Sequence, residues 1–316
     1  MVGMQARYKH EAASRKRMQT VVDDDARMTV KTSRGDADMA EETKSIAGVA
    51  EGVPFLAFPP AEGSHDSAPL VVAWHLMDAP RTEAALAAAL PLRGLNAWKV
   101  YLGLPMMSSR LPDGGFDEVI RLSYADVVLN VYKPVFEQAL SEFPAVLANL
   151  RQRFGIGDVP LALIGGSAGA AVAQLVALEA GVDARALVLI SPVTHLRKMV
   201  DAESIEYGMT YEWSPEALEA ARRIDFAARA GEFAAKDPAV LIVVGADDSA
   251  KAFVEPAREL HEALRSVYSD PARVALEVIP DMGHAFAEQP GDEPAPQIPA
   301  AVTLDGLASA WLGRWV

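Results

Sequence analysis

The sequence predicts an α/β fold in which a mostly parallel central sheet carries helices on both faces. Short apolar runs of about four to eight residues recur along the chain, rich in aliphatic side chains and bounded by Gly, Pro or Asp. Amphipathic segments with helical spacing separate most of these runs. Strands that alternate with helices are typical of parallel sheets that are buried on both sides.

The apolar runs and the amphipathic segments predict the elements in order. The expected strands are residues 70–74, 99–102, 161–164, 186–190, 240–244 and 274–279. The expected helices are residues 81–90, 131–154, 168–178, 215–229, 250–267 and 299–315. Residues 194–236 form a longer connection than usual between two strands, and we interpret them as a short cap insertion.

Composition excludes several classes of protein. The 316 residues include 29 basic and 43 acidic side chains, a net charge of −14, which disfavours nucleic acid as a partner. Cysteine is absent, so disulfides, thiolate nucleophiles and cysteine-ligated metals are excluded, and no His-Glu-x-x-His spacing indicates zinc. No apolar run approaches the ~18 residues of a membrane span. We expect a cytoplasmic protein with no metal and no cofactor.

The N-terminal segment differs from the rest of the chain. Residues 1–44 have mixed charges and few apolar side chains, and no apolar stretch of a signal peptide follows the early basic residues. We expect a disordered tail over residues 1–44 and one domain over residues 45–316.

The most informative motif is Gly-x-Ser-x-Gly at residues 165–169, directly after an expected strand and before an expected helix. This is the context of a nucleophile elbow, in which Ser167 occupies a strained turn at the carboxyl end of the sheet. The alternative is an ordinary glycine-rich turn between a strand and a helix, as in any doubly wound protein. The nucleotide-binding versions of this turn are disfavoured, because the chain has no Gly-x-Gly-x-x-Gly here and no Gly-Lys-Ser/Thr.

A serine hydroxyl needs a neighbouring base, and the acid that orients this base comes from another strand end. The histidines are His10, His65, His75, His195, His261 and His284. Only His284 lies in a loop directly after the last expected strand, whereas His261 lies within an expected helix. Asp247 and Asp248 both follow the strand at 240–244, and either could instead cap the next helix.

Together these segments resemble the α/β-hydrolase superfamily, most closely its single-domain esterases and the catalytic domains of prolyl-oligopeptidase-like enzymes. The resemblance covers residues 46–316 and rests on the Gly-x-Ser-x-Gly segment, on Gly245-Ala-Asp-Asp248 and on Gly283-His284. It implies the α/β-hydrolase fold and a catalytic triad. Ser167 would attack a carbonyl, His284 would carry the proton, and Asp248 rather than Asp247 would orient the histidine.

The predicted oxyanion hole departs from the family pattern. One backbone N–H should come from Ala168, directly after the nucleophile. By analogy the other comes from the loop after the strand at 70–74, where His75 matches the family histidine but Leu76 and Met77 replace its glycines. We expect the Leu76 N–H to be the second donor, with the Met77 N–H as the alternative. The Leu76 side chain should narrow the acyl pocket, and His75 should have a structural role.

The sequence therefore predicts a cofactor-independent serine hydrolase that cleaves small carboxylic esters through an acyl-enzyme. One alternative is an aminopeptidase or acyl-peptide hydrolase with the same triad. Binding of an N-terminal amine would need a pair of carboxylates, which the sequence does not locate. The other alternative is a catalytically silent binding protein with the same fold.

Overall fold

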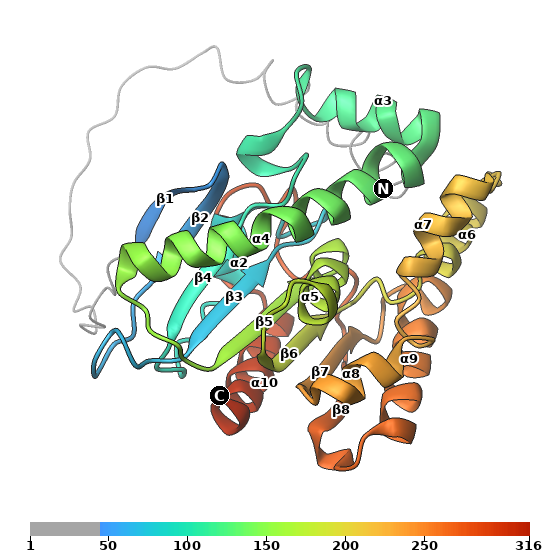
Figure 1. Cartoon of the computed structure of the whole chain (residues 1–316). Helices are drawn as coiled ribbons and strands as arrows, with labels where there is room; N and C mark the ends of the chain where they lie inside the picture. The colour runs from blue at the N-terminus through green and yellow to red at the C-terminus, as the bar shows by residue number, and fades with distance from the viewer. Residues whose placement is uncertain (1–44) are drawn as a thin grey trace.

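The computed structural model describes residues 45–316, so the predicted tail at residues 1–44 lies outside the described part. A single eight-stranded sheet crosses the molecule and helices cover both of its faces (Figure 1). The strand order is β1-β2-β4-β3-β5-β6-β7-β8, and every neighbouring pair from β4 to β8 is parallel. The predicted α/β fold is confirmed.

The strands are β1 (Ile46–Ala50), β2 (Val53–Phe58), β3 (Leu70–Trp74), β4 (Trp98–Leu102), β5 (Leu161–Gly166), β6 (Ala184–Ile190), β7 (Ala239–Gly245) and β8 (Val274–Ile279). All six expected strands are present. The sequence analysis missed β1 and β2, an antiparallel hairpin at one edge of the sheet. Both strands are apolar, but β1 contains a glycine and two alanines and β2 contains Pro54, and these residues are infrequent in strands.

The helices are α2 (Glu83–Ala89), α3 (Gly115–Val127), α4 (Lys133–Phe154), α5 (Ala168–Glu179), α6 (Leu196–Glu206), α7 (Pro215–Arg223), α8 (Ala230–Lys236), α9 (Glu255–Val267) and α10 (Pro299–Trp315). Short π-helical and 3-10 segments are η1 (Ser108–Arg110), η2 (Val128–Tyr132), η3 (Ala250–Val254) and η4 (Pro271–Arg273). The sequence analysis missed α3, α6 and α8. The helix expected over residues 215–229 ends at Arg223.

The hydrophobic core has two layers, one on each face of the sheet. Alternate residues of β6 belong to different layers: Leu187 and Leu189 pack with α4, α5 and α9, whereas Val188 and Ile190 pack with α2 and α10. Figure 1 shows α4 and α5 on one side of the sheet and α10 on the other. Burial on both faces explains why the central strands read as continuous apolar runs.

Residues 194–236, the expected cap, contain α6, α7 and α8. Helix α6 packs against η3, which follows β7, and α8 packs against α9. Tyr211 donates a hydrogen bond to Asp126 Oδ1 at 2.6 Å, which ties the segment to the end of α3. The cap role of these residues stays a prediction. Among residues 45–316, no helix has the length and apolar character needed to cross a membrane.

Candidate active site

Ser167 lies at the turn between β5 and α5, at the carboxyl end of the parallel strands. Its backbone angles are φ 50° and ψ −116°, a conformation that L-residues rarely adopt. Two backbone hydrogen bonds hold it: the Ser167 N–H donates to the Ile190 carbonyl at 2.9 Å, and the Val193 N–H donates to the Ser167 carbonyl at 3.2 Å. The neighbouring strand β6 therefore fixes the position of the serine.

The glycines around Ser167 allow the backbones to approach closely. A Cβ atom at Gly169 would lie 2.5 Å from the His75 carbonyl oxygen, and one at Gly165 would overlap the Gly169 carbonyl. Neither position can hold a larger side chain without moving backbone. This close approach of β5, α5 and the loop after β3 is the physical reason for the Gly-x-Ser-x-Gly pattern.

A chain of hydrogen bonds joins Ser167, His284 and Asp248, which we call the triad residues. The distance from Ser167 Oγ to His284 Nε2 is 2.9 Å, and that from His284 Nδ1 to Asp248 Oδ2 is 3.0 Å. The Asp248 side chain is only 1% exposed and that of His284 11%. With the Nδ1 proton donated to the carboxylate, Nε2 is left to accept the serine proton.

The structure places Asp248, and not Asp247, against the histidine. The buried Asp248 carboxylate also accepts a hydrogen bond from the Ser249 N–H at 2.7 Å. Asp247 is exposed, and its N–H donates to the Met282 carbonyl at 2.9 Å. A Cβ atom at Gly245 would clash with that same carbonyl, so glycine lets the loops of Asp248 and His284 pack backbone to backbone.

The surroundings of His284 favour its protonated form. Burial alone would lower the pKa of His284, but the charge and hydrogen bond of Asp248 raise it above its ordinary value. The Phe253 ring stacks on the imidazole with centroids 3.9 Å apart and planes tilted by 30°. Phe253 therefore covers one face of the base and limits its rotation.

Two further carboxylates, Asp78 and Glu203, act on the site, and the sequence analysis did not identify either. The charges of both raise the pKa of His284 and that of the buried Tyr132 phenol. Asp78 lies in the loop after β3 and Glu203 in α6, and both are half-buried. Asp78 stands two residues from Leu76, in the loop whose backbone N–H groups are the expected oxyanion donors, and no motif marks its side chain. Glu203 was missed because α6 was not predicted.

The candidate oxyanion donors differ from the prediction at one position. Ala168 begins α5, and among the described residues its N–H has no acceptor. The Leu76 N–H donates to the Pro80 carbonyl at 3.1 Å, which contradicts its predicted role because a tight turn already uses this donor. The N–H of Met77, the alternative donor, has no acceptor within residues 45–316.

The side chain of Leu76 also differs from the expectation. It is fully buried, and its methyl group would overlap a Cβ at Gly166, in the core layer formed with α2 and α10. Leu76 therefore supports the elbow from within the core. The expected narrowing of an acyl pocket by this side chain is wrong.

His75 has the structural role that its position predicts. Its Nδ1–H donates to the Leu76 carbonyl at 2.6 Å, and its Nε2 accepts from the Leu104 N–H at 3.0 Å. Burial lowers the pKa of His75 to about 4, so the ring is neutral near pH 7. His75 thus ties the loop after β3 to the loop after β4. Within residues 45–316, no group of three or more His, Asp or Glu side chains is arranged to hold a metal ion.

Comparison with solved structures shows the same fold. A puromycin-hydrolyzing peptidase from Mycobacterium tuberculosis aligns with a TM-score of 0.59 at 16% identity, over 88% of this chain and 40% of that one. The Pyrococcus horikoshii acylaminoacyl peptidase aligns with a TM-score of 0.56 at 11% identity, over 87% and 42% of the two chains. Carboxyl esterase 2 from the fungus Tuber melanosporum aligns with a TM-score of 0.51 at 16% identity, over 90% of each chain.

The chain thus spans about two fifths of the two peptidase chains and nearly all of the esterase. No curated protein matches the sequence. A family model described as alpha/beta hydrolase fold matches residues 123–288, which is more than half of the chain and includes all three triad residues. That match shows that the chain belongs to the alpha/beta hydrolase fold family.

Proposed function

We propose that this protein is a serine hydrolase that cleaves carboxylic esters through an acyl-enzyme. The observation that carries the proposal is the hydrogen-bonded chain from Ser167 Oγ through His284 to Asp248, with heavy-atom distances of 2.9 and 3.0 Å. Each of the three side chains comes from the carboxyl end of a different strand. Such a nucleophile, base and orienting acid support acyl transfer.

The reaction would proceed in two halves. Ser167 Oγ attacks the ester carbonyl carbon while its proton passes to His284 Nε2. The ester C–O bond then breaks while the imidazolium protonates the departing alkoxide, so that an alcohol leaves and the acyl group remains on Ser167 Oγ. In the second half, water gives a proton to the same Nε2 and attacks the acyl carbon, and the proton returns to Ser167 as the carboxylic acid leaves. Asp248 stabilises the imidazolium in both halves.

The negative charge that forms on the carbonyl oxygen needs backbone donors, each worth about 3–4 kcal/mol in a serine hydrolase. We assign this role to the Ala168 N–H and, because the Leu76 N–H is already used, to the Met77 N–H. Ala168 supports the assignment by its position at the positive end of α5, directly after the nucleophile.

A fluorophosphonate probe tests the proposed chemistry directly, because it reacts with a serine only when a base activates the hydroxyl. We expect one label per chain, on the peptide that contains Ser167, and no labelling of a His284→Ala variant. A well-folded protein that resists the probe would contradict the proposal and favour a silent binding protein.

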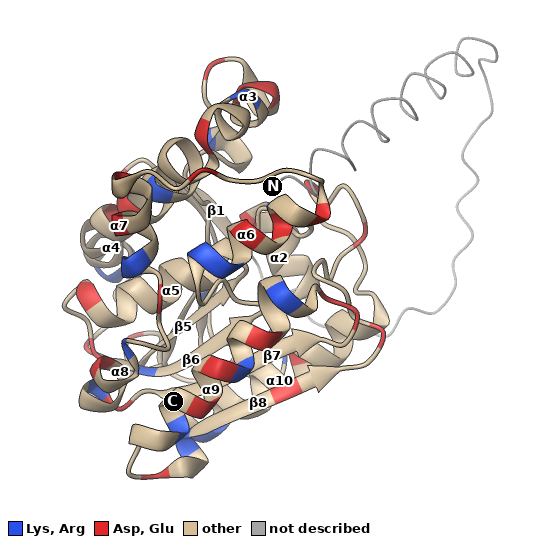
Figure 2. Cartoon of the chain, turned by 90° about the vertical axis from the view of Figure 1, so that its right-hand side faces the viewer, with Lys and Arg blue, Asp and Glu red and all other residues tan. Residues whose placement is uncertain are grey.

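A second candidate follows from Asp78 and Glu203. The charges of these carboxylates act on His284 from two different elements, and Figure 2 shows that α6 carries several acidic residues. A pair of carboxylates beside the nucleophile would bind a cationic amine of the substrate. The candidate is therefore a hydrolase of aminoacyl substrates, which would use the same triad on an ester or an amide.

Matched substrates separate the two candidates. We expect the wild type to prefer an aminoacyl nitrophenyl ester with a free amine over its N-acetylated form. Asp78→Asn and Glu203→Gln each remove one carboxylate charge. Each should lower kcat/KM for the substrate with the free amine by about tenfold, because each would lose one hydrogen bond to a charged group. Measured well above the pKa of His284, where a lower pKa no longer changes the fraction of neutral imidazole, turnover of the N-acetylated ester should be unaffected. Glu206→Gln, an exposed neighbour on α6, is the control. Equal losses on both substrates would exclude an amine subsite and leave the esterase proposal intact.

A further inference from the structure

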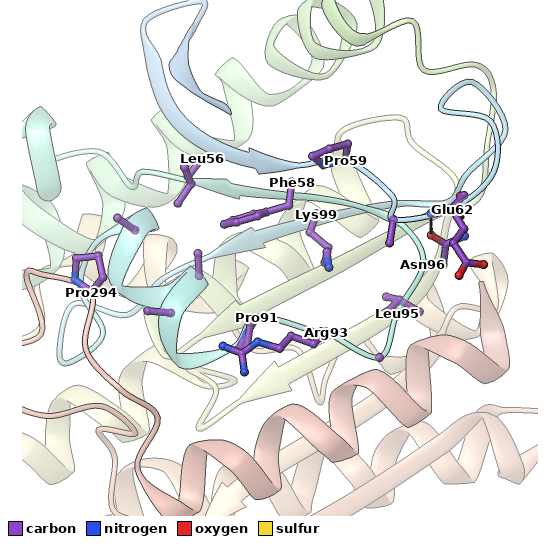
Figure 3. A pocket seen from close by; sticks show the side chains of 15 residues that line it. Leu56, Phe58, Pro59, Glu62, Pro91, Arg93, Leu95, Asn96, Lys99 and Pro294 are labelled. Atoms are coloured by element: carbon purple, nitrogen blue, oxygen red, sulfur yellow. Dashed lines mark hydrogen bonds between the residues drawn. The ribbon is translucent and has the colours of Figure 1, made fainter. Parts of the chain in front are cut away.

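A cavity of about 890 Å³ lies away from the triad, on the face of the sheet covered by α2 and α10 (Figure 3). Its walls come from β2, from β4, from α2 and from the loop at residues 91–96. Most of the lining is apolar, and includes Leu56 and Phe58 of β2, Ala84 and Ala88 of α2, and Leu95. A cavity of this volume is in the range of small-molecule sites.

Lys99 is the unusual residue in this lining. It belongs to β4, an interior strand, and its neighbours Trp98 and Val100 are buried. The ammonium donates one hydrogen bond, to the Leu92 carbonyl at 3.3 Å, although it has three N–H groups to donate. Partial burial and the charge of Arg93 both lower the pKa of Lys99.

Arg93 adds a second positive charge to the same cavity. It follows Leu92, and among residues 45–316 its guanidinium has no hydrogen-bond or ion-pair partner. Figure 3 shows Lys99 extending from β4 toward the segment of Pro91 and Arg93, whereas Glu62 lies at the other end of the cavity beside Asn96. Lys99 and the exposed Arg93 therefore lie in the same part of the lining, apart from Glu62, the carboxylate of the lining.

The acid that faces Lys99 from outside the lining is Asp305 of α10. Its charge acts on Lys99 from beyond ion-pair distance, and its Oδ1 accepts the Leu92 N–H at 2.7 Å. The Asp305 carboxylate thus already accepts a hydrogen bond from the loop backbone. Its single negative charge offsets one of the two positive charges of Lys99 and Arg93. The part of the cavity near Lys99 and Arg93 therefore has a net positive charge, although the overall charge of the chain is −14.

We propose that this cavity binds a small carboxylate with an apolar body, such as a medium-chain fatty acid. The carboxylate lies between Lys99 Nζ and the Arg93 guanidinium and accepts the hydrogen bonds that these groups do not make within the protein. The apolar body lies against Phe58, Leu56 and the alanine face of α2, where burial of each CH₂ group contributes about 0.8 kcal/mol. The site is independent of the proposed esterase activity.

Calorimetry with three ligands tests the site on the full chain. We expect decanoate to bind with one site per chain. Decanol, which has the body without the charge, and acetate, which has the charge without the body, should each bind at least about tenfold more weakly. Decanoate should bind equally well to Ser167→Ala, which separates this cavity from the triad. Equal binding of decanol and decanoate would overturn the proposal.

Three variants in the cavity, with two control variants elsewhere, place the ligand. Lys99→Met and Arg93→Gln should each lower decanoate affinity about tenfold, whereas Lys236→Met on α8 and Arg258→Gln on α9 remove the same charges elsewhere and should change nothing. Ala88→Trp fills the cavity from α2 and should abolish binding. Unchanged thermal unfolding would show that each variant is folded. Decanoate affinity that survives both Lys99→Met and Ala88→Trp would exclude this cavity as the site.

Discussion

Replacing Ser167 by alanine is expected to lower ester turnover by about 10⁵-fold or more, the scale on which loss of the nucleophile acts in serine hydrolases. The substitution removes only Oγ, which is hydrogen-bonded to His284, and leaves the backbone contacts with Ile190 and Val193 in place. Ser167 is buried (7% exposed), but the substitution removes a single hydrogen-bonded oxygen and no apolar group, so the free energy of unfolding should change by about 1 kcal/mol. Steady-state kinetics on a nitrophenyl ester and thermal unfolding measure the two effects.

Ser191 provides the matched control for Ser167. It lies at the carboxyl end of the next strand, has a similar backbone conformation with φ 41°, and is fully buried. Among the described residues its Oγ has no hydrogen-bond partner. Ser191→Ala should therefore keep turnover close to that of the wild type. If Ser167→Ala retained comparable turnover, the nucleophile assignment would be wrong.

The second large effect is expected for Asp248→Asn. An asparagine at this position fills the same space but cannot favour the tautomer in which His284 Nε2 accepts a proton, and it lacks the charge that stabilises imidazolium. We expect kcat to fall by about 10⁴-fold. Asp247→Asn changes the adjacent carboxylate in the same way, yet this side chain is exposed, so its kcat should remain near that of the wild type. Equal losses in both variants would contradict the assignment of Asp248.

The pH profiles of Asp248→Asn and Asp247→Asn test whether the charge of Asp248 raises the pKa of His284. Attack requires a neutral imidazole, so kcat/KM falls as the pH drops through the pKa of His284. Because Asp248 raises this pKa, the acidic limb of the wild type should lie above the ordinary histidine value of about 6.5. Asp248→Asn removes the charge, so the limb should move to lower pH. Asp247→Asn should leave the limb in place.

The parts of the fold that the sequence predicted share one physical property. The inner strands are buried on both faces and read as continuous apolar runs, and parallel strands place their carboxyl ends at one edge. That geometry brought Ser167, Asp248 and His284 together although 117 residues separate the first from the last. The hairpin of β1 and β2 was missed because Gly48 and Pro54 interrupt its two apolar runs, and the interior of a strand seldom contains either residue.

The rest of the site depends on loop geometry that periodicity does not encode. The use of the Leu76 N–H by the Pro80 carbonyl follows from the turn between them, and no residue pattern in that loop indicates it. Asp78, Glu203 and Phe253 act on His284 from three separate elements, so no spacing in the sequence relates them. Residues at the ends of strands can therefore be located from one sequence, whereas residues that reach the site from neighbouring helices and loops cannot.

The backbone hydrogen bonds between the loops after β7 and β8 have a consequence for evolution. The amides of Ala246 and Asp247 bind the carbonyls of Ile279 and Met282, so main-chain atoms set the spacing between these loops. The exposed side chains of Pro280 and Asp281 can therefore vary among homologues without displacing the imidazole from its carboxylate, whereas Met282 is held in the core. An insertion or deletion in either loop would shift these backbone hydrogen bonds out of register. We therefore expect the residue types of the two loops to vary among homologues while the lengths of the loops stay constant.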